Sequence, residues 1–197
     1  MILTIMGRND IYRDDITRRK WRIEMIEYIL LGFLMERDMT GYDMKQHMSI
    51  STSYFVDASF GSIYPALKRL EKKGFVEVKE SIENGKLKKI YAMNELGKAE
   101  FLKWLASPIL ISRTDSSSPL AKIFFFRYLP REQALALTEQ CILDLGNYKK
   151  SLLELKGRVE EKADPFQLCT LDYGLDSYDF AIHWCKEHLI QKLKKED

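Results

Sequence analysis

The residues best placed to do chemistry are lysines, and they gather in two short stretches of the chain. One stretch runs from Phe60 to Lys73 and the other surrounds the dipeptide Asn84-Gly85. Lysine side chains neutralise nucleic-acid phosphates, and small or hydrogen-bonding groups beside them can approach base edges. The two stretches therefore indicate nucleic-acid binding.

The first stretch is predicted to form a helix with two unlike faces. At about 100° per residue, one apolar stripe falls within about 60° and contains Ile63, Ala66, Leu67 and Leu70. The opposite side carries Gly61, Pro65, Lys68 and Lys72, with Tyr64 and Arg69 at the flanks. A helix that enters a major groove by its N-terminal end needs this order, with small groups first and cations after them. The wheel alone also fits an ordinary helix with a solvated lysine face.

The second stretch favours DNA over that plainer interpretation. Lysines crowd around the Asn84-Gly85 turn, partly offset by Glu80 and Glu83, and a mobile basic turn suits contact with phosphates or a minor groove. The lysines are Lys79, Lys86, Lys88 and Lys89.

The elements needed to position these residues can be traced along the chain. A densely apolar helix is predicted from about Trp21 to Arg37, with core on most sides. Thr40 can cap a second helix that continues through Met48. Ser59 stands ahead of the third helix, and Gly74 ends that helix as a C-terminal cap.

Two β-prone runs follow, Phe75 to Lys79 and Leu87 to Met93, and Asn84-Gly85 between them is a strong hairpin signal. Asn94 then caps a helix that ends near Ala106. Three helices, a hairpin and a further helix make a winged helix-turn-helix. The predicted fold class is mainly α with a small β-hairpin wing.

The C-terminal part is predicted to form an antiparallel pair of long helices. The residues 107–118, which include three consecutive serines, are interpreted as a linker. Heptad seams follow, joined by a turn at Asp164-Pro165. The first seam is Cys141, Leu145, Tyr148, Leu152, Leu155 and Val159; the second is Leu168, Leu171, Leu175, Tyr178, Ile182, Cys185 and Leu189. Such a hairpin buries one side of each helix, and a second copy of the chain would cover the rest.

The predicted organisation is therefore an N-terminal extension, a DNA-binding domain, a linker and a helical dimerisation domain, at residues 1–20, 21–106, 107–118 and 119–197. The extension is interpreted as a frayed segment or a basic arm. The 31 Lys and Arg residues against 29 Asp and Glu give a net charge of only +2, which argues against a nonspecific DNA-architectural protein. Three scattered cysteines, no membrane-length apolar run and no signal-peptide pattern suggest a cytoplasmic protein.

No pattern for catalysis, a cofactor or a metal emerges. His183, Cys185 and His188 diverge around one helix and lack a partner cluster, so a metal site is rejected. Trp104 with Phe101, or Trp184 with the aromatics of residues 124–126, could line an apolar ligand pocket, but core packing is favoured. We expect a protein that is not an enzyme, with an unknown small-molecule effector as a further expected partner.

At this point the sequence resembles a known family, the PadR-type transcriptional regulators. The resemblance covers roughly residues 24–195 and rests on three motifs: Ile29-Leu30-Leu31-Gly32-Phe33-Leu34, Thr40-Gly41-Tyr42-Asp43, and Ser62-Ile63-Tyr64-Pro65-Ala66-Leu67-Lys68-Arg69-Leu70-Glu71-Lys72-Lys73-Gly74. The run Lys122-Ile123-Phe124-Phe125-Phe126, which leads into long helices, is similar to the larger subgroup with a full C-terminal domain.

The resemblance implies a homodimer that binds an inverted repeat and usually represses genes for stress or detoxification, or its own gene. The residues it would place at double-stranded DNA are Ser59, Ser62, Tyr64, Pro65, Lys68 and Lys72, with Tyr42 and Lys45 beside them and Lys86 and Lys88 on the wing. The sequence departs from the family pattern at two places. The wing tip carries lysines where the family often has arginines, and the usual Leu-Thr is missing after Tyr91. The alternative functions are a helical protein–protein adaptor and a nonspecific architectural protein.

Overall fold

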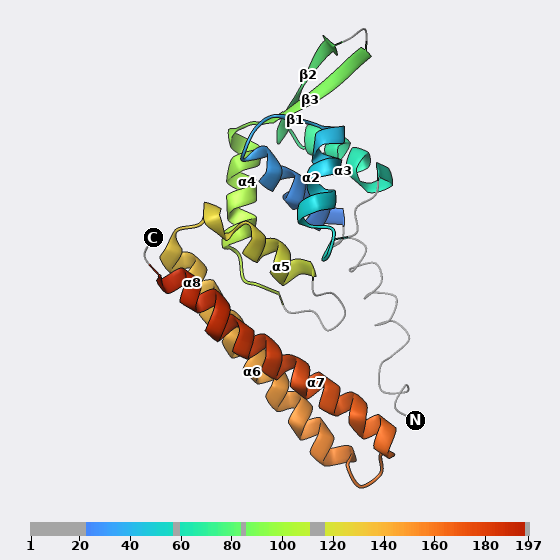
Figure 1. Cartoon of the computed structure of the whole chain (residues 1–197), viewed down its shortest axis with the longest axis vertical. Coiled ribbons are helices and arrows are strands. Elements are labelled where there is room, and N and C mark those ends of the chain that lie inside the picture. The colour runs from blue at the N-terminus through green and yellow to red at the C-terminus, as the bar shows by residue number, and fades with distance from the viewer. Residues whose placement is uncertain (1–22, 57–59, 84–85, 111–116, 196–197) are drawn as a thin grey trace. The chain divides into compact units, whose positions relative to one another are not determined.

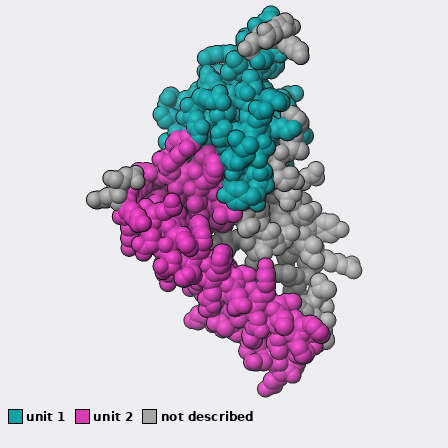
Figure 2. All heavy atoms as spheres, viewed as in Figure 1, with its two compact units in different colours: residues 1–104 teal, residues 105–197 magenta. Residues whose placement is uncertain are grey.

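The computed structural model describes residues 23–56, 60–83, 86–110 and 117–195. It divides into two compact units, residues 1–104 and residues 105–197 (Figure 2). The first unit holds a helix over residues 23–34, followed by β1 (Met39–Thr40), α2 (Gly41–Ser51), α3 (Phe60–Lys72), β2 (Val76–Glu83), β3 (Lys86–Met93) and most of α4 (Glu95–Ala106). The second holds α5 (Ser117–Phe124), a 3-10 turn (Phe126–Tyr128), α6 (Arg131–Val159), α7 (Pro165–Trp184), a π-helical segment (Cys185–Ile190) and α8 (Gln191–Lys194).

The helix over residues 23–34 lies in the core of the N-terminal unit, as its dense apolar sequence predicts. Ile29, Leu30 and Phe33 have no exposed surface. The prediction was wrong at the C-terminal end, because the helix ends at residue 34 and a turn occupies residues 35–36. The chain then enters β1, which pairs with β3 through Met39 and Thr40. A strand of two residues is too short to give a periodic signal, and the sequence did not reveal it.

The capping predictions are confirmed in this unit. Thr40 and Asp43 form a reciprocal capping box at the start of α2, which continues three residues beyond the predicted end. Gly74, the second residue after α3, adopts a positive φ of 71°, and its lack of a Cβ makes this left-handed cap accessible. Asn94 accepts the N–H of Gly97 at 3.0 Å at the start of α4.

The three strands form an antiparallel sheet in the order β1-β3-β2. The β2–β3 register runs from Val76 opposite Met93 to Glu83 opposite Lys86. Both strands extend further toward the turn than predicted, because the added residues of β2 are mostly polar and give only a weak β signal in the sequence. The Asn84-Gly85 turn itself lies outside the described residues. The β2–β3 ribbon projects away from the helices of its unit (Figure 1).

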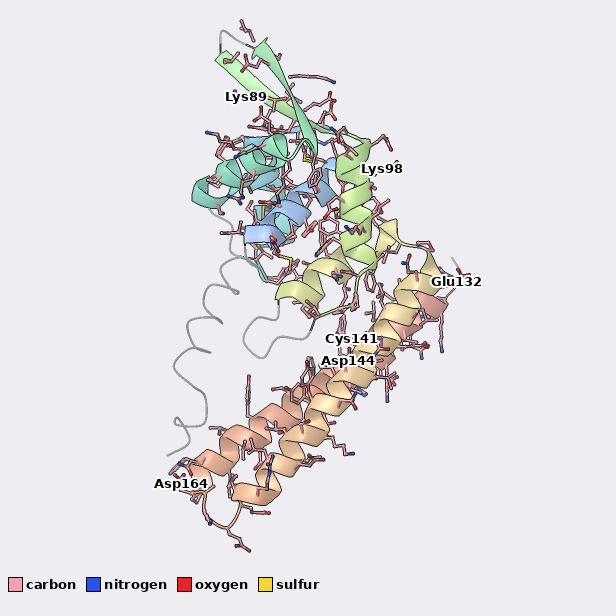
Figure 3. The ribbon with its side chains drawn as sticks, turned by 180° about the vertical axis from the view of Figure 1, so that it is seen from behind. Lys89, Lys98, Glu132, Cys141, Asp144 and Asp164 are labelled. Carbon is pink, nitrogen blue, oxygen red and sulfur yellow. The ribbon has the colours of Figure 1, made fainter. Side chains whose placement is uncertain are left out.

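In the C-terminal unit, α6 and α7 lie antiparallel, as the two seams predict (Figure 1). Lys149 pairs with Asp179 at 2.6 Å and Lys156 with Asp172 at 2.5 Å across the two helices. Asp164 caps α7 at the turn (Figure 3). The linker prediction was too long at its C-terminal end, because Ser117 and Ser118 already belong to α5.

Candidate nucleic-acid interface

The apolar stripe of α3 is buried as the helical wheel predicts. Ile63, Ala66, Leu67 and Leu70 are each at most 1% exposed. The opposite side faces out, with Tyr64 47% exposed and Pro65, Lys68 and Lys72 exposed beside it. Helix α3 therefore offers a surface with a tyrosine and a proline toward its N-terminus and lysines toward its C-terminus.

A buried carboxylate holds two further cations, Arg69 of α3 and Lys73 directly after it. Glu27 is 4% exposed; its carboxylate accepts Arg69 Nε at 2.5 Å and Lys73 Nζ at 2.6 Å. Arg69 and Lys73 therefore anchor α3 to the first helix. The sequence held one signal for this ion pair, an acidic residue within an apolar helix. A carboxylate that is buried with such a helix requires cationic partners.

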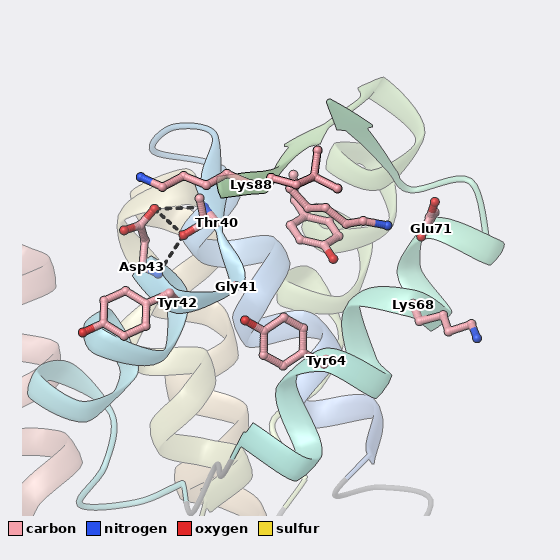
Figure 4. Close-up of a pocket in the computed structure, with 11 residues that line it drawn as sticks. Thr40, Gly41, Tyr42, Asp43, Tyr64, Lys68, Glu71 and Lys88 are labelled. Atoms are coloured by element: carbon pink, nitrogen blue, oxygen red, sulfur yellow. Dashed lines mark hydrogen bonds between the residues drawn. The ribbon is translucent and has the colours of Figure 1, made fainter. Parts of the chain in front are cut away.

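Tyr64 is positioned by a close approach to the start of α2. A Cβ added to Gly41 would lie 2.8 Å from Tyr64 Cε1 and 3.0 Å from Cζ. The absence of a side chain at Gly41 lets the ring lie against the backbone, and a Cβ there would displace the Tyr64 ring (Figure 4). The contact therefore links the glycine of the Thr-Gly-Tyr-Asp motif to the tyrosine of α3.

The capping box beside Tyr64 also fixes a negative charge. The Asp43 carboxylate accepts the Thr40 N–H at 3.0 Å and the Thr40 hydroxyl at 2.7 Å. These two hydrogen bonds lower the pKa of Asp43, burial opposes them, and the charges of Arg37 and Lys88 lower the pKa further. Asp43 is therefore ionised and occupied with capping α2.

A groove of about 730 Å³ connects α2, α3 and the wing (Figure 4). Three of its lining residues are lysines and two are carboxylates, of which Asp43 is occupied by Thr40. The lining residues are Thr40, Gly41, Tyr42, Asp43, Tyr64, Lys68, Glu71, Leu87, Lys88, Lys89 and Tyr91. The groove lining therefore has a formal charge of only +1, three lysines against two carboxylates, and its lysines are the groups that could meet a polyanion.

The wing lysines do not form the single basic cluster that the sequence suggested. Lys89 pairs with Glu80 at 3.4 Å, and Lys79 lies 4.0 Å from Asp38. Both pairs are exposed, so each contributes little to stability, but each reduces the local charge of the wing. Lys88 lines the groove.

The groove brings together four of the ten residues predicted at the interface: Tyr42, Tyr64, Lys68 and Lys88. The Tyr42 hydroxyl also accepts Gln46 Nε2 at 3.1 Å. Ser62, Pro65 and Lys72 lie on α3 and Lys45 on α2, all outside the groove lining. Ser59 and the side chain of Lys86 lie outside what the structure describes. The sequence did not mark the other lining residues for the interface, because their positions depend on the fold; they include Gly41, Asp43, Glu71, Leu87 and Tyr91.

Aromatic residues near the end of α4 pack against the first helix. Trp104 is 7% exposed and stacks on Tyr28, with ring centroids 4.6 Å apart and planes 5° apart. The Tyr28 hydroxyl donates to Glu100 at 3.2 Å. Burial and then the neighbouring Glu100 raise the pKa of Tyr28 to about 12. These contacts favour the core-packing interpretation of Trp104.

Within the described ranges, no three His, Cys, Asp or Glu side chains gather closely enough to hold a metal ion. Within the same ranges, every helix is too short or too polar to cross a bilayer.

Comparisons with known proteins give a consistent family. Residues 30–103 match the model of the Transcriptional regulator PadR-like family. The chain is 29% identical over 156 residues to the negative transcriptional regulator PadR of Bacillus subtilis, covering 77% of this chain and 84% of that protein.

Two crystal structures of Bacillus subtilis PadR are also similar. The one in complex with operator DNA is 24% identical, with a TM-score of 0.44, covering 84% of this chain and 97% of that one. The one in complex with p-coumaric acid is 22% identical, with a TM-score of 0.41, covering 88% of this chain and 98% of that one. Residues 30–103 therefore belong to the PadR-like family of transcriptional regulators, and the chain is similar to a PadR over most of its length.

Proposed function

We propose that this protein is a ligand-responsive repressor that binds an inverted repeat in DNA as a homodimer. The observation that carries the proposal is the groove between α2, α3 and the wing, where Tyr42, Tyr64, Lys68 and Lys88 meet. A helix with one exposed polar face beside a basic β-ribbon fits a major groove and the phosphates that border it. The relationship to a negative regulator supports repression.

Exposed aromatic residues on α7 support the homodimer. Phe166, Tyr173 and Phe180 are 83%, 77% and 69% exposed, and their spacing of seven residues places them along one side of the helix. This stripe is separate from the seam that packs α7 on α6. A second copy of the chain would cover it, and the two α3 helices would then be related by a two-fold axis.

The experiment that tests DNA recognition is selection of duplexes by the purified protein from a random-sequence library. We expect enrichment of one inverted repeat. In the Lys88→Ala variant, two phosphate contacts are lost per dimer, so the slope of log affinity against log salt falls by about two, roughly 0.9 for each contact. Sequence preference stays the same, because phosphate contacts do not specify bases. Failure to enrich any sequence would contradict the proposal.

The effector is tested on the same duplex. We expect a small molecule to release the protein, and p-coumaric acid is the first compound to try because Bacillus subtilis PadR has been crystallised with it. The readout is the apparent affinity for the selected duplex with and without the compound, with benzoic acid as a smaller aromatic control.

A further inference from the structure

Two cysteines that lie far apart in the sequence come together in the C-terminal unit. Cys141 lies on α6 (Figure 3), and Cys185 is the first residue of the π-helical segment that continues α7. Both are free thiols and buried, with 6% and 7% of their surface exposed. Single π-helical turns within helices are frequent at functional sites. The fold therefore unites two nucleophilic groups to which the proposed function gives no role.

The register of α6 and α7 places the two cysteines opposite each other. Tyr148 of α6 stacks on Tyr178 of α7, with ring centroids 6.3 Å apart. Cys141 lies seven residues before Tyr148, and Cys185 lies seven residues after Tyr178. Positions one heptad apart lie on the same side of a helix, so antiparallel helices that meet at the tyrosines also meet at the cysteines. Helix α6 contacts the π-helical segment accordingly.

Helices packed in this way bring opposed positions to the separation that a disulfide needs. The axes of packed helices lie about 8–10 Å apart and each Cα lies about 2.3 Å from its axis, so Cα atoms that face each other are about 3.4–5.4 Å apart. This range overlaps the Cα separation of disulfides, about 4.4–6.8 Å. The seam is tight in the same register, because a Cβ added to Gly174 of α7 would lie 2.7 Å from Leu152 Cδ2 of α6.

The two thiols also change each other's ionisation. Hydrogen bonding with Cys141 lowers the pKa of Cys185, and burial opposes this effect. Hydrogen bonding with Cys185 and then burial raise the pKa of Cys141. Because the thiolate is the nucleophile in cysteine oxidation, Cys185 is the thiol that attacks an oxidant, and Cys141 is the thiol that resolves the product.

We propose that Cys141 and Cys185 are a redox-sensitive pair, which a hydroperoxide converts into an intrachain disulfide. The Cys185 thiolate attacks one oxygen of hydrogen peroxide, the O–O bond breaks, and hydroxide leaves as water with the proton that the thiol released. Cys141 then attacks the sulfenic acid at Cys185, so that the S–S bond forms, the S–O bond breaks and a second water leaves. The two thiols supply both electrons and both protons, and the product ties α6 to the end of α7.

The first test is peroxide oxidation of the full chain carrying Cys169→Ser, which removes the third, exposed thiol. The protein is reduced, treated with hydrogen peroxide, and measured by thiol titration in denaturant and by intact mass. We expect both thiols to disappear together with a mass loss of about 2 Da, two hydrogen atoms, and dithiothreitol to restore them. Peptide mapping should join Cys141 to Cys185. The matched control Cys169→Ser/Cys185→Ser should show no such mass loss.

A second measurement shows whether the fold itself pairs the thiols. The Cys169→Ser protein is equilibrated with reduced and oxidised glutathione, in buffer and in urea. A disulfide that fits the native geometry stabilises the fold, and by linkage the fold stabilises the disulfide to the same extent. The equilibrium constant for forming it should therefore be about 30-fold to 1000-fold larger in the native protein than in urea.

Several results would overturn the inference. One is the persistence of both thiols after peroxide treatment, and another is the addition of oxygen to the cysteines without a cross-link. A cross-link that joins two copies of the chain, or equal equilibrium constants in buffer and in urea, would overturn it as well. None of these measurements involves DNA, so their outcome is separate from that of the proposed function.

Discussion

Replacing Glu27 with glutamine tests whether a buried carboxylate holds α3 in place. Glu27 is 4% exposed and binds two cations, Arg69 at 2.5 Å and Lys73 at 2.6 Å. Glutamine keeps the size but loses the charge, and it leaves two cations facing a neutral group. Removing one partner of a fully buried ion pair costs about 3–5 kcal/mol. The cation side chains are 37% and 46% exposed, so water compensates part of the loss and we expect about 2–3 kcal/mol.

The assay is equilibrium unfolding in urea, followed by tryptophan fluorescence, for Glu27→Gln, Lys73→Met and the double variant. If the pair acts as a unit, the two single losses should not add, and the coupling energy should exceed about 0.5 kcal/mol. Glu71→Gln serves as a control, because Glu71 is exposed on the same helix. Strictly additive effects, or a loss no greater than that of the control, would refute the anchoring role.

Three further predictions concern other parts of the chain. Tyr64→Ala should weaken binding to the selected duplex by about 1–3 kcal/mol and to random DNA much less; equal losses with an intact melting temperature would make Tyr64 a positioning contact. Burial lowers the pKa of Lys122 to about 8 from 10.5, so between pH 8 and pH 10.5 the unfolded state binds more protons than the folded state. Over this range the free energy of unfolding of the wild-type protein should rise by about 3 kcal/mol relative to that of Lys122→Met. A difference in urea unfolding that does not change with pH would contradict this. Tyr173→Glu/Phe180→Glu should shift a dimer to monomer in light scattering without loss of helicity, and an unchanged mass would remove the stripe from the interface.

Local signals in the sequence predicted much of the N-terminal unit. The cap at Thr40, the stop at Gly74 and the apolar stripe of α3 each depend on neighbouring residues, and the structure confirms them. The seams of α6 and α7 were also predictable from neighbouring residues, because the same heptad spacing of apolar residues recurs over several turns of each helix.

Features that depend on distant residues could not be predicted. Glu27 meets Arg69 and Lys73 only after α3 has packed on the first helix. Likewise, Glu80 neutralises Lys89 because strand pairing places them opposite each other, so counting lysines along the sequence overstated the charge of the wing. The groove itself combines α2, α3 and β3, and its lining follows from the fold.

The measurement that tests the central claim most directly is a hydroxyl-radical footprint of the protein on its selected duplex, with the subunit stoichiometry determined in parallel. A two-fold dimer places its two α3 helices in major grooves about 34 Å apart, or a multiple of that distance. The account predicts two subunits per duplex and two symmetric protected regions whose centres are separated by close to a whole number of helical turns. A single asymmetric footprint, or one subunit bound per duplex, would contradict it.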